Sequence, residues 1–198
     1  MDHSQRTRVR AGDHDEFGAL FTEHARAVYN HAFRLTGSWS AAEEVVSLTF
    51  LEAWRLRGTL RPEGGSLLPW LLGIALNVSR NLSRAARRHQ AAMSRLPPAR
   101  SVPDFADELA GRLDDAEQLK NVHAAIVGLR RAERDVLALC VWSGLDYAEA
   151  AEALGVPVGT VRSRLSRARR KLQNQTARNR EPGPANEQVS GDRVGGTR

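Results

Sequence analysis

Cysteine and lysine are almost absent from this sequence, and aromatic residues are sparse. Cys140 is the single cysteine of the 198 residues, which excludes an internal disulfide and predicts a buried structural thiol. Lys120 and Lys171 are the only lysines, so arginine carries nearly all of the positive charge, as is typical of a GC-rich genome. Aromatic side chains account for only 6% of the chain, whereas 41% hydrophobic and 26% charged residues are ordinary for a globular protein.

Long hydrophobic runs are also missing. Residues 1–17 have no apolar core, so they do not form a secretory signal. The most apolar stretch, residues 67–78, is far shorter than the roughly 20 residues that a membrane-spanning helix needs. The sequence therefore predicts a cytoplasmic protein that does not insert into a membrane.

Groupings of metal ligands are absent as well. Five of the histidines show no metal-ligand spacing with Asp, Glu or Cys: His14, His24, His31, His89 and His123. The chain also has no Gly-rich phosphate loop. We therefore expect neither an enzyme nor a bound metal or other cofactor.

Acidic residues are missing from two long stretches, residues 64–103 and 155–180. The chain as a whole has a net charge of +6 and a pI of about 10.5. Such a balance predicts an acidic partner, either nucleic acid or an anionic membrane surface.

No convincing alternating strand pattern occurs, and apolar residues recur at helical spacing throughout, so we expect an all-α fold. The first helix is expected over residues 15–35. The second is expected from Ser40 to about Arg57, with Ser40 and Glu43 forming a capping box. Ser66 is expected to cap a third helix, and the three helices can form a small bundle.

The rest of the chain divides into a linker, a second helical module and a tail. Three prolines mark the linker, and an acidic run over residues 104–117 follows the basic stretch, either as a tether through a charged environment or as a solvated linker. The tail lacks the apolar residues needed to fold. The expected boundaries are 13–90 for the first domain, 91–115 for the extended linker, 116–175 for the second domain and 176–198 for a disordered tail.

The second module contains a helix-turn-helix pattern. Asp146 and Glu149 predict an N-terminal cap for a short helix, which Gly155 ends. A tight turn then leads into a longer, strongly basic helix, whose Val161 and Leu165 face the shared core.

The basic helix is expected to bind duplex DNA. In this motif the N-terminal part of the second helix reads base edges in the major groove, where arginine can donate two hydrogen bonds to guanine. Basic helices also bind membranes or acidic proteins, but the short preceding helix and the lack of large exposed apolar residues favour DNA. The expected DNA contacts are Thr160, Arg162, Ser163, Ser166, Arg167 and Arg170, with Arg164, Arg169 and Lys171 on phosphates.

Two stretches carry a resemblance to a known family. Residues 144–172, GLDYAEAAEALGVPVGTVRSRLSRARRKL, closely resemble region 4 of bacterial extracytoplasmic function (ECF) sigma factors of the sigma-70 family, which reads the −35 promoter element. The first module resembles region 2 in residues 17–46, 50–55 and 69–81. The resemblance implies a three- or four-helix bundle and a helix-turn-helix domain.

The resemblance also implies a function. Such a protein binds core RNA polymerase through the β′ clamp coiled coil and the β flap, reads the −35 duplex and holds the melted −10 strand. The residues implied for polymerase are Glu43, Glu44, Ser47 and Phe50. Those implied for the −10 strand are Arg61, Ser66, Trp70, Asn77, Arg80, Asn81 and Arg84. Trp70 suits core packing equally well. Many relatives are held inactive by an anti-sigma factor, which makes such a factor a candidate partner.

Rival interpretations remain at this stage. A conventional helix-turn-helix regulator acting without core polymerase would usually dimerise and carry a ligand or receiver domain. A polymerase-binding regulator without promoter choice would need only the first module and would leave the basic helix unexplained. Promoter-specific initiation with core polymerase would separate the sigma-factor reading from both.

Overall fold

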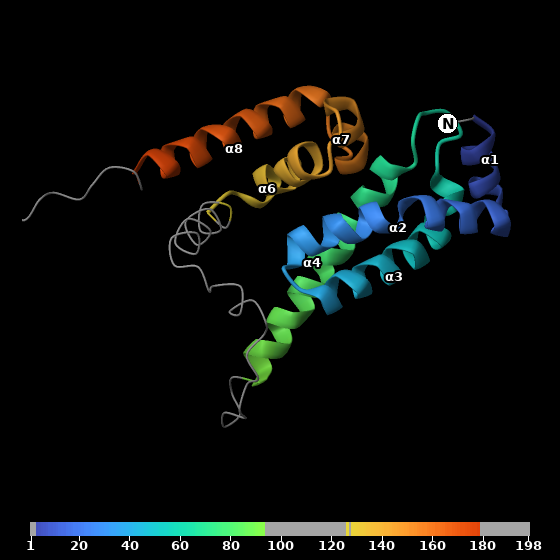
Figure 1. The fold of residues 1–198 in the computed structure, drawn as a ribbon, viewed down its shortest axis with the longest axis horizontal. Coiled ribbons are helices and arrows are strands. Elements are labelled where there is room, and N and C mark those ends of the chain that lie inside the picture. Colours follow the sequence, from blue (N-terminus) through green and yellow to red (C-terminus); the bar gives the residue numbers. More distant parts are fainter. Residues whose placement is uncertain (1–2, 94–125, 127, 179–198) are drawn as a thin grey trace, which may run out of the picture.

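The computed structural model describes residues 3–93, 126 and 128–178, and this part of the chain is helical throughout with no strand (Figure 1). The all-α prediction is thus confirmed. The described residues fall into an N-terminal module, residues 3–93, and a C-terminal module, residues 126 and 128–178. Most of the predicted linker, the acidic run 104–117 and the tail beyond residue 178 lie outside the described residues.

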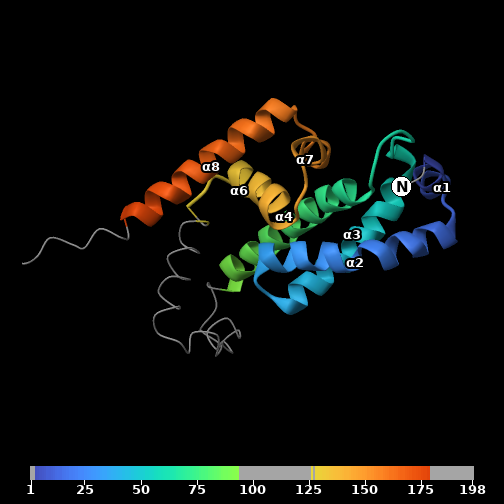
Figure 2. The same cartoon turned by 45° about the horizontal axis from the view of Figure 1, so that its top comes forward.

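Three helices form the bundle of the N-terminal module: α2 (His14–Thr36), α3 (Trp39–Leu56) and α4 (Leu68–Met93). Leu20 and Val28 of α2 and Val45 of α3 are fully buried, and so are Leu71 and Ala75 of α4. Buried residues recur at helical spacing along each of the three helices. Figures 1 and 2 show that α4 passes beside α2 and α3 and reaches the C-terminal module.

The start of α3 differs from the prediction. Its N-cap is Ser38, which has an extended backbone and accepts a hydrogen bond from the backbone N–H of Ala41 at 3.4 Å. Ser40 lies inside the helix. Gly37, at φ 69°, ends α2 and leaves a single residue before α3, so the cap falls two positions earlier than the predicted capping box. Ser66, predicted to cap α4, lies one residue before the N-cap position, and its Oγ accepts from the N–H of Leu68, the first residue of the helix, at 3.1 Å.

An N-terminal helix, α1 (His3–Ala11), was not predicted. The short 3₁₀ turn η1 (Arg57–Thr59) follows α3, and α1 packs against it. Val9 is fully buried and Arg6 is 2% exposed, although the segment has few apolar residues. The helix is held by contacts with distant residues, which its own periodicity does not reveal.

The C-terminal module comprises α6 (Arg131–Leu137), the π-helical turn η3 (Ala138–Trp142), α7 (Tyr147–Leu154) and α8 (Val158–Arg178). Val136, Leu139 and Leu165 are buried between these helices. Helix α8 continues to Arg178, beyond the predicted start of the tail. Cys140 is half-buried, and burial raises the pKa of its thiol, which therefore stays protonated.

Candidate nucleic-acid interface

The helix-turn-helix is built by local capping. Asp146 Oδ1 accepts from the backbone N–H groups of Ala148 and Glu149, both at 2.8 Å, and Glu149 Oε2 accepts from the N–H of Asp146 at 2.9 Å. Gly155, in the left-handed conformation at φ 63°, ends α7. The predicted capping box and helix end are both confirmed. They fix where α7 begins and where it ends, and therefore where the turn into α8 starts.

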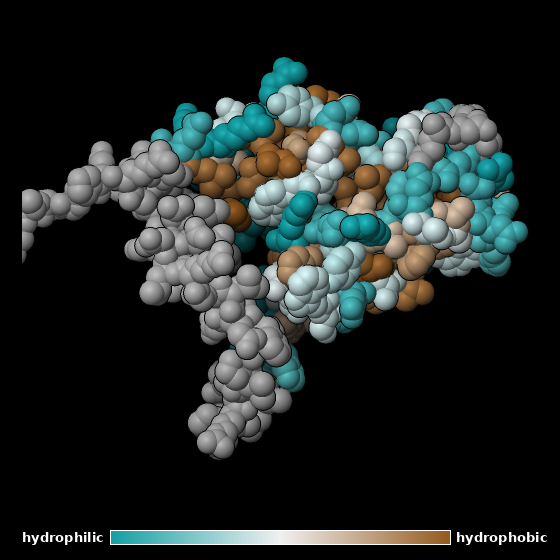
Figure 3. Space-filling model, in the orientation of Figure 1, coloured by the Kyte–Doolittle hydropathy of each residue, from teal (hydrophilic) through white to brown (hydrophobic). Residues whose placement is uncertain are grey.

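Helix α8 divides cleanly into a buried and an exposed face. Val161, Leu165 and Ala168 are buried at 0–1% exposure, one turn apart. Six of the predicted DNA contacts are exposed on the rest of the helix surface, namely Arg162, Ser163, Ser166, Arg167, Arg169 and Arg170. Hydrophilic side chains accordingly lie along the upper rim of the molecule, where α8 runs (Figure 3). No acid of α8 itself balances this charge.

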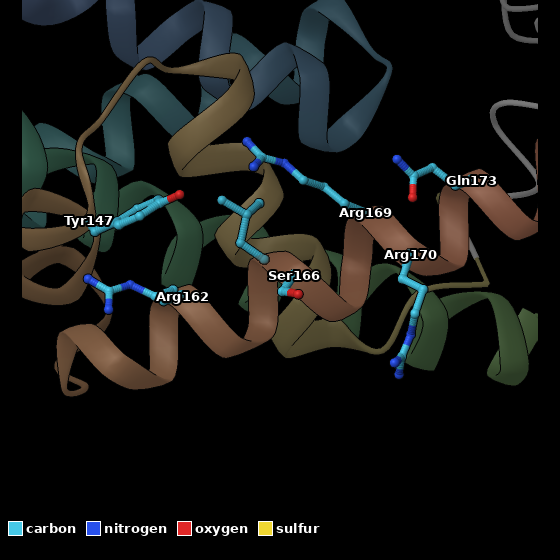
Figure 4. Close-up of a pocket in the computed structure, with 7 residues that line it drawn as sticks. Tyr147, Arg162, Ser166, Arg169, Arg170 and Gln173 are labelled. Carbon is cyan, nitrogen blue, oxygen red and sulfur yellow. The ribbon is translucent and has the colours of Figure 1, made fainter.

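A hollow beside α8 brings in a residue that the sequence reading missed. The Arg162 guanidinium lies 6.0 Å from the ring centroid of Tyr147, the first residue of α7, within reach of a cation–π attraction. Figure 4 shows Arg162 beside Tyr147, with Arg169 and Arg170 pointing to opposite sides of α8. The lining residues are Tyr147, Arg162, Leu165, Ser166, Arg169, Arg170 and Gln173. The sequence did offer a signal for Tyr147, because it is an aromatic residue directly after the predicted N-cap Asp146.

Three other predicted contacts of α8, Lys171, Thr160 and Arg164, are ion-paired or partly buried. Lys171 Nζ lies 2.7 Å from Glu133 Oε2, a carboxylate with only 4% side-chain exposure. Burial opposes ionisation of Glu133, but Lys171 and the N–H of Arg130 outweigh it and hold its pKa below the ordinary value. Lys171 therefore neutralises a buried acid in this structure. Thr160 and Arg164 are half-buried, and the Thr160 carbonyl accepts from Ser163 Oγ at 3.0 Å.

Helix α4 presents a polar row from the set predicted for the −10 strand. Arg80 Nη1 donates to Asn77 Oδ1 at 2.9 Å, and Arg84 Nη2 donates to Asn81 Oδ1 at 2.7 Å. Asn77, Asn81 and Arg84 are exposed, whereas Arg80 also forms an ion pair with Asp135 of α6. Trp70 is half-buried against the core.

The loop between η1 and α4 carries the other two predicted −10 residues, Arg61 and Ser66. Two arginines of α1, neither of them predicted as a functional residue, donate hydrogen bonds to the backbone of this loop. Arg6 donates to the carbonyls of Arg61 (3.3 Å), Glu63 (2.8 Å) and Ser66 (3.3 Å), and Arg10 donates to the carbonyl of Leu60 (2.8 Å). Arg6 also pairs with Glu152 of α7 at 2.9 Å.

The outer face of α3 carries the residues predicted for polymerase. Glu43, Glu44 and Ser47 are exposed, but Phe50 is only 6% exposed and packs edge-on against Phe21, with ring centroids 4.7 Å apart. Phe50 is thus a core residue, and the prediction that it contacts polymerase is wrong for this structure. Two leucines not assigned to this face are exposed on α3, Leu48 at 36% and Leu51 at 66%.

The described residues contain neither a cluster of metal-ligating side chains nor a helix that could span a membrane. None of their His, Cys, Asp and Glu side chains gather in groups of three or more that could hold a metal ion. None of the described helices is both long and apolar enough to cross a membrane.

Comparison with known proteins gives matches along both modules. The family model described as sigma-70 region 2 matches residues 20–89, and that described as sigma-70, region 4 matches residues 119–172. The RNA polymerase sigma factor CarQ of Myxococcus xanthus is 33% identical over 170 residues, covering 83% of this chain and 91% of CarQ. The ECF RNA polymerase sigma factor SigL of Mycobacterium tuberculosis is 32% identical over 157 residues, covering 78% of this chain and 85% of SigL.

One solved structure resembles this protein over most of the length of both chains. It is the sigma factor RpoE from Bartonella quintana, crystallised in complex with the anti-sigma factor NepR. The TM-score is 0.58 with 27% sequence identity, and the match covers 83% of this chain and 99% of RpoE.

Proposed function

This chain belongs to the sigma-70 family of RNA polymerase sigma factors, in its ECF group, and from that premise we propose that it brings core RNA polymerase to promoters through two separate DNA contacts. Members of the family are transcription initiation factors. We assign polymerase and −10 binding to residues 13–90, and −35 binding to residues 116–175.

The −35 contact is assigned to α8, and the observation that carries it is the division of that helix into a buried apolar face and an exposed arginine face. Arg162 and Arg167 lie in the N-terminal half of α8 and can each donate two hydrogen bonds to a guanine. Arg164, Arg169 and Arg170 supply charge for phosphates. DNA thus provides the counter-charge that α8 lacks.

The −10 contact is assigned to the polar row of α4 together with the loop that precedes it. Unstacking a base costs a few kcal/mol, which a binding pocket must offset with stacking and hydrogen bonds. Asn77, Asn81 and Arg84 offer donors along one face of α4, and Arg61 is exposed on the loop. Arg6 gives this loop a fixed shape by binding three of its carbonyls.

Core polymerase is assigned to the outer face of α3. Glu43, Glu44 and Ser47 give this face its polar groups, and the exposed Leu48 and Leu51 give it apolar area. A contiguous patch of exposed apolar side chains beside charges is typical of a protein contact. An anti-sigma factor is a further candidate partner, because RpoE was crystallised with one.

Run-off transcription tests the proposal. Core polymerase with this protein should start transcripts on a genomic promoter library, and the new starts should share paired −35 and −10 motifs. A conventional regulator would instead bind duplex DNA tightly by itself and give core polymerase no new starts. That result would contradict the assignment.

A pair of variants places base reading on α8. Arg167→Ala should relax discrimination at one base of the −35 element by about 1–3 kcal/mol, roughly 5- to 150-fold in binding ratio. Arg169→Ala, on the phosphate side, should weaken binding equally for all −35 sequences and lower the salt dependence. Equal loss of discrimination in both variants would argue against base reading by Arg167.

A further inference from the structure

The loop between η1 and α4, residues 60–67, has little that could hold its own shape. Two consecutive glycines, Gly64 and Gly65, lie within it, and glycine loses more conformational freedom on folding than any other residue. In the described part of the chain, backbone–backbone hydrogen bonds hold only the two ends of the loop, at Leu60 and Leu67. The middle of the loop must therefore be held by contacts from outside it.

A single buried side chain provides those contacts. The carbonyl oxygens of Arg61, Glu63 and Ser66 converge on the guanidinium of Arg6, at 2.8–3.3 Å from its Nη atoms. Gly64 lies against the same group, because a Cβ there would overlap Arg6 Nη1, and its φ of 134° lies in the region that favours glycine. The loop thus wraps around one guanidinium.

Helix α1 fixes the place of that guanidinium. Val9 is fully buried, and Arg10 Nη1 donates to the carbonyl of Leu60 at 2.8 Å, so α1 is attached both to the core and to the start of the loop. Only Gly12 and Asp13 separate α1 from α2, and Asp13 caps α2. The helix therefore has little freedom to move relative to the bundle that carries the loop.

An arginine at this position is energetically costly. Its guanidinium is removed from water, its Nε has no hydrogen-bond partner among the described residues, and its ion-pair partner Glu152 is 45% exposed. An apolar residue could fill the space without that desolvation, as Val9 does one turn further along α1. Arginine adds a planar fork of donors that holds several oxygens in one geometry. The use of arginine indicates that the shape of the loop matters, and not only the stability of the module.

We propose that Arg6 is a positioning residue for −10 recognition and that α1 is part of the −10 site. At 2% exposure Arg6 acts through the loop, whose Arg61 and Ser66 are assigned to the melted strand. A loop already in its binding conformation needs no ordering when a base binds, and it discriminates better between bases. The match to sigma-70 region 2 begins at residue 20, so it does not account for α1. Because the strand contact is assigned under the proposed function, the role of Arg6 rests on that function.

Arg6→Met and Arg6→Lys test the proposal in the assembled holoenzyme. Core polymerase with full-length protein is titrated with promoter DNA that is duplex at −35 and single-stranded over the −10 element, carrying each base in turn at each −10 position. A wrong base typically costs roughly 5- to 150-fold in affinity. Arg6→Met, of similar length but without donors, should reduce this ratio at one −10 position by roughly 5-fold or more. Arg6→Lys, which keeps three donors, should restore part of it.

An abasic nucleotide at the same position separates positioning from stability. Affinity for the abasic strand reports contacts that do not involve the base, so it should be the same in wild type and Arg6→Met, and −35 preference should also be unchanged. Glu152→Gln is the matched control, because it removes the ion pair but leaves the three carbonyl bonds of Arg6. It should keep the base preference of wild type.

Gly64→Ala is a second variant that does not touch the buried arginine. Its methyl group forces the exposed loop away from the guanidinium, so the same base preference should be lost at the same −10 position. This variant decides the question where Arg6→Met fails to fold, as judged by circular dichroism.

Three outcomes would contradict the role of Arg6. Full base preference in folded Arg6→Met and in Gly64→Ala would overturn it. So would an equal loss of affinity for base-containing and abasic strands, since Arg6 would then only stabilise the module. If the wild-type holoenzyme itself shows no preference among −10 bases, the proposed function fails at the −10 element and the role of Arg6 fails with it. The inference alone fails where wild type shows the preference and the variants keep it.

Discussion

The two modules are stabilised by different kinds of side chain. The N-terminal bundle is rich in aromatic contacts: Phe17 packs edge-on against Trp54 with ring centroids 5.0 Å apart, and Phe33 lies 4.3 Å from Trp39. The core of the C-terminal module is made of smaller residues, including Val136, Leu139, Leu165 and several alanines. A core with little apolar area depends heavily on each leucine in it.

Their charges differ in the same way. Ion pairs such as Arg8–Glu16 and Arg55–Glu52 balance charge within the N-terminal module. In the C-terminal module the acids Glu133 and Asp135 are buried and pair with cations, while the arginines of α8 face solvent. The surface pairs of the first module are thus local, whereas the second module buries acids and leaves the arginines of α8 without a counter-charge on that helix.

Removing one leucine from each core should have the largest effect and tests whether the two modules are stabilised separately. Leu165→Ala, at a site 1% exposed, should destabilise the C-terminal module by about 2–5 kcal/mol. Backbone amides of α6–α8 should then lose hydrogen-exchange protection while those of α2 and α3 keep it. Leu71→Ala in the N-terminal bundle is the matched control and should affect α2–α4 first. Equal loss across both modules in both variants would mean that they unfold as one unit.

A smaller effect is expected at Arg6, the buried arginine of the N-terminal module. Arg6→Gln leaves loop carbonyls without their donor and should destabilise the loop that follows η1 by roughly 1–3 kcal/mol. Hydrogen exchange should rise for the amides of residues 60–66. Transcription should become less selective at a base of the −10 element, while −35 selectivity should not change.

Arg8→Gln is the matched control for Arg6. Arg8 is half-exposed and pairs with Glu16 across the surface of the same module, so its loss should cost less than about 1 kcal/mol. If both variants change exchange in the loop equally, the role assigned to Arg6 is wrong.

Local signals in the sequence predicted the parts of the site that local interactions build. The helix-turn-helix was predictable because Asp146, Glu149 and Gly155 cap their own helix within a few residues. The exposed face of α8 followed from the 3.6-residue period of Val161 and Leu165. Phe50, which the family resemblance assigned to a polymerase contact, is instead buried in the core of the N-terminal bundle.

Contacts between distant residues were not predictable. Arg6 is buried because it binds carbonyls 55 to 60 positions further along the chain, and the sequence around it shows only a basic segment. Lys171 pairs with Glu133, which lies 38 positions earlier in the sequence. The sequence around Lys171 shows only a basic helix, so Lys171 was predicted to contact DNA like the other cations of α8. The contact between the modules left a trace in the sequence at Gly73, in the second turn of α4, where a Cβ would overlap the carbonyl oxygen of Ala153 in α7.

The contact between the modules should also depend on pH, and this is the smallest of the expected effects. Burial, aided by the positive charge of Arg34, lowers the pKa of His31 from 6.5 to about 4. His31 Nε2 is buried with no hydrogen-bond partner among the described residues, so a second ring proton would lack an acceptor. Ser143 of the C-terminal module covers Nδ1, and opening the modules would expose the ring and return its pKa towards 6.5.

Because the pKa of His31 is lowered while the two modules are packed together, protein whose modules are apart binds more protons between pH 6.5 and 4. The contribution of His31 to the packing of the modules is therefore fully present above pH 6.5 and is lost as the pH falls towards 4. Between pH 7 and pH 5.5 the loss should be about 1 kcal/mol.

Asp135 titrates in the opposite sense, since burial raises its pKa, so the comparison must be made against His31→Asn. Small-angle X-ray scattering at pH 7 and 5.5 should show expansion in wild type and a smaller change in His31→Asn. Equal expansion in both proteins would place the pH response elsewhere, and His31 would then be a packing residue of the N-terminal bundle alone.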